Sequence, residues 1–236
     1  MRIYRFDEIN STNTFLKGRD DLANYDMAIA RVQTAGRGRR GNDWKSPEGA
    51  ALFSFALKEE KYLPIEEWRK LPLVVGISVL RGLELVEAGD YKFKWTNDVY
   101  LEDRKVSGIL VEKVDGFFII GIGINVNNRE FGELDHKATS LARESGKNYD
   151  PEEVAFKIIE EFKRCYSKFL MGGWTELLYE MNSKNYLRDR SIKIDLRNRV
   201  EAGVAKEIAT DGTLVVEVDG ERRNYDVGEI HISFEG

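Results

Sequence analysis

The sequence of 236 residues contains one cysteine, two histidines and four prolines, and it has no long apolar run. The single cysteine, Cys165, cannot form an internal disulfide, and it excludes a zinc site built from several cysteines. His136 and His231 are too few to favour a histidine-based metal site or a catalytic triad. No apolar stretch reaches the roughly 18 residues of a membrane span, and the first residues lack a secretory signal. We therefore expect a cytoplasmic protein with no membrane partner.

The charge balance is slightly acidic, with 36 Lys and Arg against 41 Asp and Glu, which gives a net charge of −5. This balance disfavours a protein that grips nucleic acid by its overall charge, but it leaves room for a local basic site. At roughly 150 residues per domain, the length predicts one or two domains. A chain of this size can bury roughly 70% of its unfolded surface, so a core can form without disulfides.

The hydrophobic pattern predicts an α+β region followed by an all-β region. In the first region we expect strands at 2–6, 27–32, 51–57, 91–95, 99–101, 106–112 and 117–126, and helices at 14–23, 65–88, 140–145, 151–170 and 174–184. Turns at Asp103-Arg104 and Asp115-Gly116 make the last four of these strands a β-meander.

The all-β region contains five short strands, which we expect at 192–195, 200–208, 213–218, 224–227 and 230–234. Asp211-Gly212 and Asp219-Gly220 are typical hairpin turns, so this region is predicted to be a small β-barrel. The change from a mixture of predicted helices and strands to predicted strands alone indicates two domains, residues 1–186 and residues 187–236.

A glycine-rich segment, Gly36-Arg37-Gly38-Arg39-Arg40-Gly41, matches the pattern G-x-G-x-x-G of dinucleotide-binding folds. That fold needs a helix that begins inside the motif. The residues that follow, 42–49, include Pro47 and cannot form the body of a helix. A solvated basic loop is one interpretation. Because glycines let the backbone approach an anion and arginines bind it bidentately, a loop that wraps a phosphate-bearing ligand is the other.

Two further patterns are unusual. Lys94-Trp95-Thr96-Asn97-Asp98 ends one predicted strand, and the run from Lys105 to Glu112 follows it. A β-turn accounts for the Asn-Asp pair but not for two lysines at the edges of one apolar hairpin. Gly121 and Gly123 remove side chains from one face of a strand, so another backbone or a ligand must approach there, unless the glycines mark a bulge.

Taken together, these segments resemble the biotin protein ligases. The run 33–41 with Trp44, Ser46, Pro47 and Gly49 is similar to the biotin-binding loop of that family, and residues 94–98 are similar to its Lys-Trp-Pro-Asn-Asp motif. The runs 11–13, 105–112, 121–126 and 138–141 also match in order, so the resemblance covers the whole chain. Thr96 replaces the family proline, and Asn42 stands where an arginine is common.

The resemblance implies an α+β fold with a mixed sheet and helices, as in class II aminoacyl-tRNA synthetases and biotin synthetases, followed by a C-terminal SH3-like β-barrel. It implies a biotin–[biotin carboxyl carrier protein] ligase, which makes biotinyl-5′-AMP from biotin and ATP and then transfers the biotinyl group to a carrier lysine. Some members carry an N-terminal DNA-binding domain. Because the catalytic sheet is predicted to begin at Arg2, we expect no DNA partner. A homodimer is one expected assembly. A lipoate–protein ligase and a non-catalytic biotin sensor are the alternatives.

The resemblance also assigns roles to individual residues. The catalytic residues are Lys105, Arg39 and Asp98, of which Asp98 is the candidate base for the second step. The residues expected to contact biotin are Ser11, Thr12, Gln33, Gly36, Arg37, Arg39, Lys105, Gly108, Gly121, Gly123 and Ile124. Those expected to contact ATP are Arg37, Arg39, Arg40, Trp44, Lys94, Asn97, Asp98 and Asn125. Mg²⁺ is expected to bind through the phosphates of ATP rather than in a cluster of protein ligands.

Overall fold

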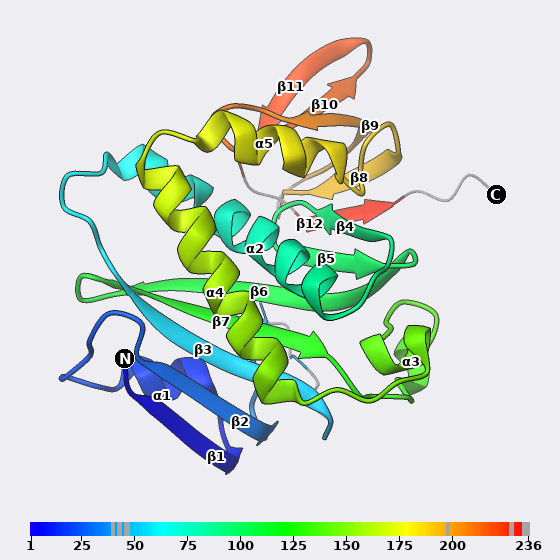
Figure 1. Ribbon diagram of the computed structural model, residues 1–236. Helices are drawn as coiled ribbons and strands as arrows, with labels where there is room; N and C mark the ends of the chain where they lie inside the picture. Colours follow the sequence, from blue (N-terminus) through cyan, green and yellow to red (C-terminus); the bar gives the residue numbers. More distant parts are fainter. Residues whose placement is uncertain (39–40, 42–43, 45–47, 197–198, 227–228, 233–236) are drawn as a thin grey trace.

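The structure, a computed structural model, describes residues 1–38, 41, 44, 48–196, 199–226 and 229–232 (Figure 1). The strands in these residues form one sheet of seven strands and one of five. The larger sheet has the order β1-β2-β3-β7-β6-β5-β4. Its strands are β1 (Ile3–Ile9), β2 (Met27–Gln33), β3 (Ala50–Lys58), β4 (Tyr91–Lys94), β5 (Asp98–Leu101), β6 (Arg104–Val114) and β7 (Phe117–Asn125). The β1–β2 pair is parallel and the other pairs are antiparallel, so the sheet is mixed.

Strands β4 to β7 form the predicted meander, because each of them pairs with the strand that follows it. The turn between β6 and β7 lies at Asp115 and Gly116, as expected, with φ of 41° and 79°. The turn predicted at Asp103-Arg104 is wrong by one residue, since Glu102 and Asp103 have φ of 49° and 62°. A two-residue hairpin loop of type I′ needs positive φ at both central positions, and here two acidic residues adopt it without a glycine.

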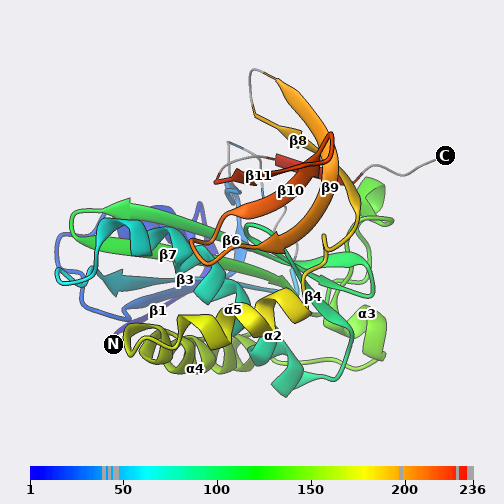
Figure 2. The same ribbon diagram turned by 90° about the horizontal axis from the view of Figure 1, so that it is seen from above.

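Helices cover both faces of the seven-stranded sheet (Figures 1 and 2). α1 (Thr12–Lys17) packs on one face against β2, β3 and β7. α2 (Leu71–Val86) and α4 (Pro151–Leu170) pack against each other on the opposite face, where the larger hydrophobic core lies. The remaining helical segments are η2 (Ile65–Lys70), η3 (Gly132–Leu134), α3 (Leu141–Ser145) and α5 (Trp174–Ser183). No helix within the described ranges is both long and apolar enough to cross a membrane.

α4 has the bounds that the sequence predicts, because its start is strongly specified. Asp150 accepts a hydrogen bond from the Glu152 N–H at 2.9 Å, and Pro151 occupies the first helical position. Two other helices differ from the prediction. α1 ends at Lys17 rather than at residue 23, since Gly18 is a weak helix former. The segment 65–88 is split, because Pro72 lacks an N–H and its ring opposes an α-helical turn before it, so that η2 is 3₁₀.

The all-β prediction for the C-terminal region is confirmed by an antiparallel sheet with the order β11-β10-β9-β8-β12. Its strands are β8 (Ser191–Asp195), β9 (Val200–Ile208), β10 (Leu214–Val218), β11 (Glu221–Tyr225) and β12 (Glu229–Ile232). β11 begins before the predicted 224–227, because Asp219 and Gly220 form a tight turn directly after β10. This sheet lies beside the meander (Figure 2). One contact between the two is the hydrogen bond that Trp95 Nε1 donates to the Gly212 carbonyl at 3.0 Å.

Candidate active site

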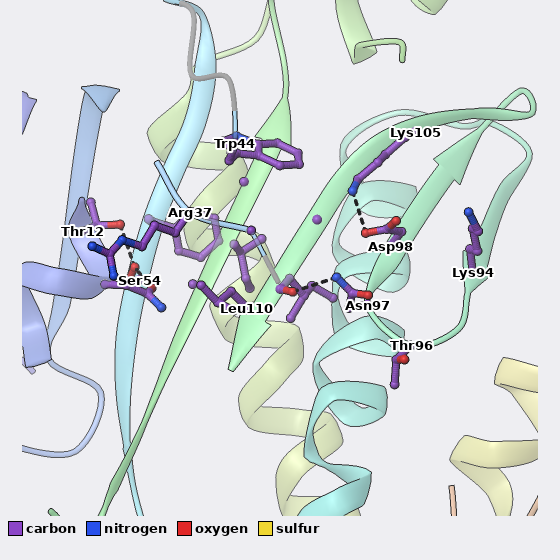
Figure 3. Close-up of a pocket in the computed structure, with 18 of the residues that line it drawn as sticks. Thr12, Arg37, Trp44, Ser54, Lys94, Thr96, Asn97, Asp98, Lys105 and Leu110 are labelled. Atoms are coloured by element: carbon purple, nitrogen blue, oxygen red, sulfur yellow. Dashed lines mark hydrogen bonds and ion pairs between the residues drawn. The ribbon is translucent and has the colours of Figure 1, made fainter. Parts of the chain in front are cut away.

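A cavity of about 270 Å³ opens on the α1 face of the larger sheet, between α1, the meander and β12. Figure 3 shows the part of this cavity between Thr12 and Lys105. Twelve of the residues expected to contact biotin or ATP line the cavity: Ser11, Thr12, Gln33, Arg37, Trp44, Lys94, Asn97, Asp98, Lys105, Gly108, Gly121 and Gly123. They come from β2, β4, β5, β6, β7, the start of α1 and the glycine-rich loop. Segments that are far apart in the sequence therefore meet at one site.

One end of the cavity is cationic. Lys105 Nζ lies 2.7 Å from Asp98 Oδ1 and 5.3 Å from the centre of the Trp44 ring. A bulge explains why Lys105 points into the cavity. Asp98 pairs with Gly108, but Tyr100 pairs with Lys105, so Val106 is an extra residue in β6. The alternation of side chains shifts by one, and Lys105 takes the same face as Tyr100 and Asp98.

The other end of the cavity, called the neutral end for its hydroxyl and amide groups, also holds the Arg37 side chain, which lies beside Thr12 and Ser54 in Figure 3 and helps to lower the pKa of Glu112. The Thr12 N–H donates to Gln33 Oε1 at 2.8 Å, and the Thr12 hydroxyl lies 3.0 Å from the same oxygen. The Thr12 hydroxyl is also 2.7 Å from the Ser54 hydroxyl. Thr12 and Ser54 are both buried, and they lie at the opposite end of the cavity from Lys105 in Figure 3. This end can exchange hydrogen bonds with a neutral polar group of a ligand.

An ion pair lies behind the neutral end. Ser54 donates to Asn13 Oδ1 at 2.5 Å, and Asn13 Nδ2 donates to Glu112 Oε2 at 2.9 Å. Lys17 Nζ binds Glu112 Oε1 at 2.7 Å. Burial raises the pKa of Glu112, but the hydrogen bonds from Lys17 and Asn13 outweigh it, so that the pKa lies below its usual value. Glu112 is therefore an ionised hydrogen-bond acceptor at neutral pH.

The glycine stripe of β7 makes room for two side chains. A Cβ atom on Gly121 would lie 2.2 Å from Asn13 Oδ1, and one on Gly123 would lie 2.5 Å from Trp44 Cε2. Gly108 pairs with Gly123 and leaves space for the same indole, with 2.7 Å between a Cβ and Trp44 Cζ3. The bulge interpretation is wrong, because β7 keeps one register with both neighbours. What fills the space above the glycines is Asn13 and Trp44.

Three predicted contact residues do not line the cavity. Ile124 faces the larger core, and the Gly36 carbonyl accepts a hydrogen bond from the Trp44 N–H at 3.0 Å. Asn125 is buried, and its Nδ2 donates to the Thr139 carbonyl at 2.9 Å, so it ties the segment before α3 to β7. Arg39 and Arg40 lie outside the described residues.

The turn at the end of β4 is held by backbone contacts. The Asn97 side chain donates to the Ile109 carbonyl at 3.1 Å, which fixes Asn97 against β6. The Trp95–Thr96 peptide bond is cis. Lys94 Nζ lies 5.5 Å from the centre of the Tyr100 ring.

Sequence reasoning missed Asn13, Ser54 and Glu112 as site residues. Ser54 carries the clearest signal, because it is the polar residue inside an otherwise apolar predicted strand, 51–57. Asn13 and Glu112 both belong to motifs quoted above, but their contact spans 99 positions, and no local pattern connects them.

The site offers little to a metal ion by itself. Within the described ranges, no group of three or more His, Cys, Asp and Glu residues could hold one. Among the described residues that line the cavity, Asp98 is the one that carries a carboxylate. One carboxylate together with substrate phosphates is a usual arrangement for Mg²⁺, so the residues present fit a metal that arrives with a nucleotide.

Comparison with known proteins gives consistent results. The sequence model of the Biotin/lipoate A/B protein ligase family matches residues 6–127. The chain is 32% identical to the bifunctional ligase/repressor BirA of Salmonella typhimurium over 95% of this chain and 72% of that protein. It is 29% identical to the biotin–[acetyl-CoA-carboxylase] ligase of Mycobacterium tuberculosis, over 86% of this chain and 77% of that one. The fold is similar to that of the Aquifex aeolicus biotin protein ligase in complex with biotin and ATP, with a TM-score of 0.89, 31% identity and 98% of both chains covered.

Proposed function

The chain belongs to the biotin/lipoate A/B protein ligase family, and on that basis we propose that it is an ATP-dependent biotin–protein ligase. The observation that carries the proposal is the polarity of the cavity. Lys105 provides a cation at one end, and Thr12, Gln33 and Ser54 provide neutral hydrogen-bonding groups at the other. Biotin has the matching form, with a carboxylate at one end and a ureido group at the other.

The neutral end favours biotin over lipoate. The dithiolane ring of lipoate has no strong hydrogen-bonding group, so it would leave buried polar atoms of Thr12 and Ser54 without a ligand partner. A site built to hydrogen-bond a substrate discriminates strongly against an analogue that lacks the bonding group.

In the proposed first step, a biotin carboxylate oxygen attacks the α-phosphorus of ATP, the bond to the β-phosphate breaks, and pyrophosphate leaves. Two unit charges 4 Å apart repel by about 4 kcal/mol at an effective dielectric of 20, so the two anions need cations between them. We propose that Lys105 supplies positive charge at this point, whereas Arg37 lines the cavity at the end that holds Thr12 and Ser54. We assign the same role to Arg39 and Arg40.

Asp98 forms an ion pair with Lys105. In our proposal the biotin carboxylate takes over this contact, and Asp98 becomes available to the metal that accompanies ATP. Mg²⁺ bound there would offset phosphate charge. Trp44 and Lys94 lie at the same end of the cavity and are the proposed nucleotide contacts, with Asn97 and Asn125 holding the adjacent backbone.

In the proposed second step, the amine of a carrier lysine attacks the carbonyl carbon of biotinyl-5′-AMP, the bond to the phosphate oxygen breaks, and AMP leaves. A lysine with a pKa near 10.4 is neutral in only about 1 of 2,500 molecules at pH 7. A base must therefore take its proton, and Asp98 is our candidate. The acceptor we propose is a biotin carboxyl carrier protein or domain, and the proposed location is the cytoplasm, where ATP is available.

We also propose residue 187 as the boundary between a catalytic unit and a C-terminal unit. The two units cooperate at the site, since Ile230 and His231 of β12 line the cavity beside residues of the meander. A shared hydrophobic cluster and two hydrogen bonds between Asn182 and the backbone of Ile208, each 2.8 Å long, support this docking.

The test is incubation of the purified protein with ATP, Mg²⁺, biotin and a biotin carboxyl carrier domain, with lipoate as the control substrate. We expect biotin-dependent pyrophosphate release and a carrier mass increase equal to one biotinyl group. Lys105→Ala should lower both by about 100-fold or more. Lys113→Ala, an exposed lysine on the same strand, should retain parental activity. Preference for lipoate, or biotin binding without pyrophosphate release, would contradict the proposal.

A further inference from the structure

The ion pair behind the neutral end of the cavity fixes the direction of a chain of hydrogen bonds. An ionised carboxylate can only accept, so Glu112 must receive Nδ2 of Asn13 rather than its oxygen. Oδ1 of Asn13 therefore faces Ser54, and Ser54 has to use its single proton to donate to it. Lys17 holds the second carboxylate oxygen of Glu112 in place at 2.7 Å.

The direction continues to the cavity wall. Because the Ser54 proton is committed to Asn13, the Ser54 oxygen presents lone pairs toward Thr12 and the cavity. The Thr12 hydroxyl then donates either to Ser54 or to Gln33 Oε1, and it too has lone pairs left for a ligand. The Glu112 carboxylate, which does not line the cavity, thus orients the hydroxyl groups of Thr12 and Ser54 so that their oxygens can accept hydrogen bonds from a ligand.

The sheet makes space for this chain. Ser54, Gly121 and Leu110 lie side by side on β3, β7 and β6. The Asn13 side chain crosses β7 above Gly121, where any Cβ would collide with it, and so reaches from Ser54 to Glu112. The amide is held at both ends and from below.

We propose that Asn13, Glu112 and Lys17 are positioning residues that set the Thr12 and Ser54 hydroxyls as acceptors for the N–H groups of the biotin ureido ring. This inference rests on the proposed function, because it concerns how the same cavity recognises biotin.

The test is Glu112→Gln, which keeps the shape of the side chain and removes its charge. Lys17 keeps the oxygen of the introduced amide on its own side, so the NH₂ group of that amide faces Asn13 and forces the Asn13 side chain to turn over. Ser54 then accepts from Asn13 and donates toward the cavity. We expect the KM for biotin to rise about tenfold, as for one lost hydrogen bond of about 1.4 kcal/mol. The kcat and the KM for ATP should change by less than about twofold.

The double variant Asn13→Asp with Glu112→Gln separates positioning from general damage. The carboxylate introduced at position 13 accepts a hydrogen bond from the amide introduced at position 112 and another from the Ser54 hydroxyl. Ser54 therefore donates away from the cavity again, as in the parental protein. We expect its KM for biotin to lie within about threefold of the parental value, whereas Asn13→Asp alone opposes two carboxylates and should be worse than either. Glu59→Gln, which breaks the exposed pair with Lys113, is the matched control and should leave every constant unchanged.

The outcomes are distinct. An unchanged KM for biotin in Glu112→Gln overturns the inference, as does an equal loss in kcat and in the KM for ATP, or a double variant no better than Glu112→Gln. Failure of the proposed function shows earlier, as absence of biotin-dependent pyrophosphate release by the parental protein.

Discussion

Replacing Gly121 by alanine tests the space above β7. An alanine Cβ at this position would lie 2.2 Å from Oδ1 and 2.9 Å from Cγ of Asn13. Ordinary contacts of a Cβ begin near 3.4 Å, so the Asn13 amide would have to retreat by roughly 1 Å. It cannot do so and keep its hydrogen bonds to both Ser54 and Glu112.

The expected loss follows from those two bonds. A hydrogen bond to a charged group contributes about 1.5–3 kcal/mol and a neutral one about 0.5–1.5 kcal/mol. Alanine in place of glycine within a strand returns about 0.5–1 kcal/mol of backbone entropy. The net loss in the free energy of unfolding is therefore about 1–4 kcal/mol, and the KM for biotin should rise with it.

The assay is equilibrium unfolding in guanidinium chloride, followed by circular dichroism. Gly18→Ala at the end of α1 is the control, because its Cβ would meet nothing closer than 3.6 Å and its φ is −85°. That variant should differ from the parent by no more than about 1 kcal/mol, in the stabilising direction. If Gly121→Ala were as stable as Gly18→Ala, the collision with Asn13 would not exist as described.

Two further predictions concern other parts of the molecule. Gly123→Ala should lower stability by less than about 1 kcal/mol, because the new Cβ would meet the Trp44 side chain and not a backbone atom; it should shift the tryptophan fluorescence to the red, and no shift in fluorescence would contradict the packing. Burial raises the pKa of Asp26, but hydrogen bonds from Arg2 and the Ala23 N–H outweigh it, so the pKa lies below its ordinary 3.8. Its contribution to stability is therefore complete above pH 3.8 and lost as the pH falls further. Asp26→Asn should be less stable at pH 7 and show a weaker loss between about pH 4 and pH 2, as measured by thermal unfolding; parallel pH profiles for the two proteins would refute this.

The parts of the fold that could be predicted are those with strong local signals. The bounds of α4 follow from Asp150, Pro151 and a regular apolar face, and the meander follows from alternation and turn residues. The end of α1 was predicted too late, because Leu22 and Ala23 continue the apolar pattern beyond Gly18, where the helix ends.

The site was predictable as a set of motifs but not as a geometry. Gly121 and Gly123 indicated a close approach on one face of a strand, yet nothing local identifies Asn13 and Trp44 as the groups that approach. The contact between Asn13 and Glu112 depends on the order of β3, β7 and β6, which is a property of the whole sheet.

The extra residue in β6 has a consequence for how this protein can vary. Lys105 faces Asp98 because Val106 shifts the alternation of the strand by one. Regular pairing of the same residues without the bulge would place Lys105 opposite Leu101 and turn the lysine toward the apolar core. Natural and laboratory variation that keeps the length of the β5–β6 hairpin is therefore expected to keep the bulge as well.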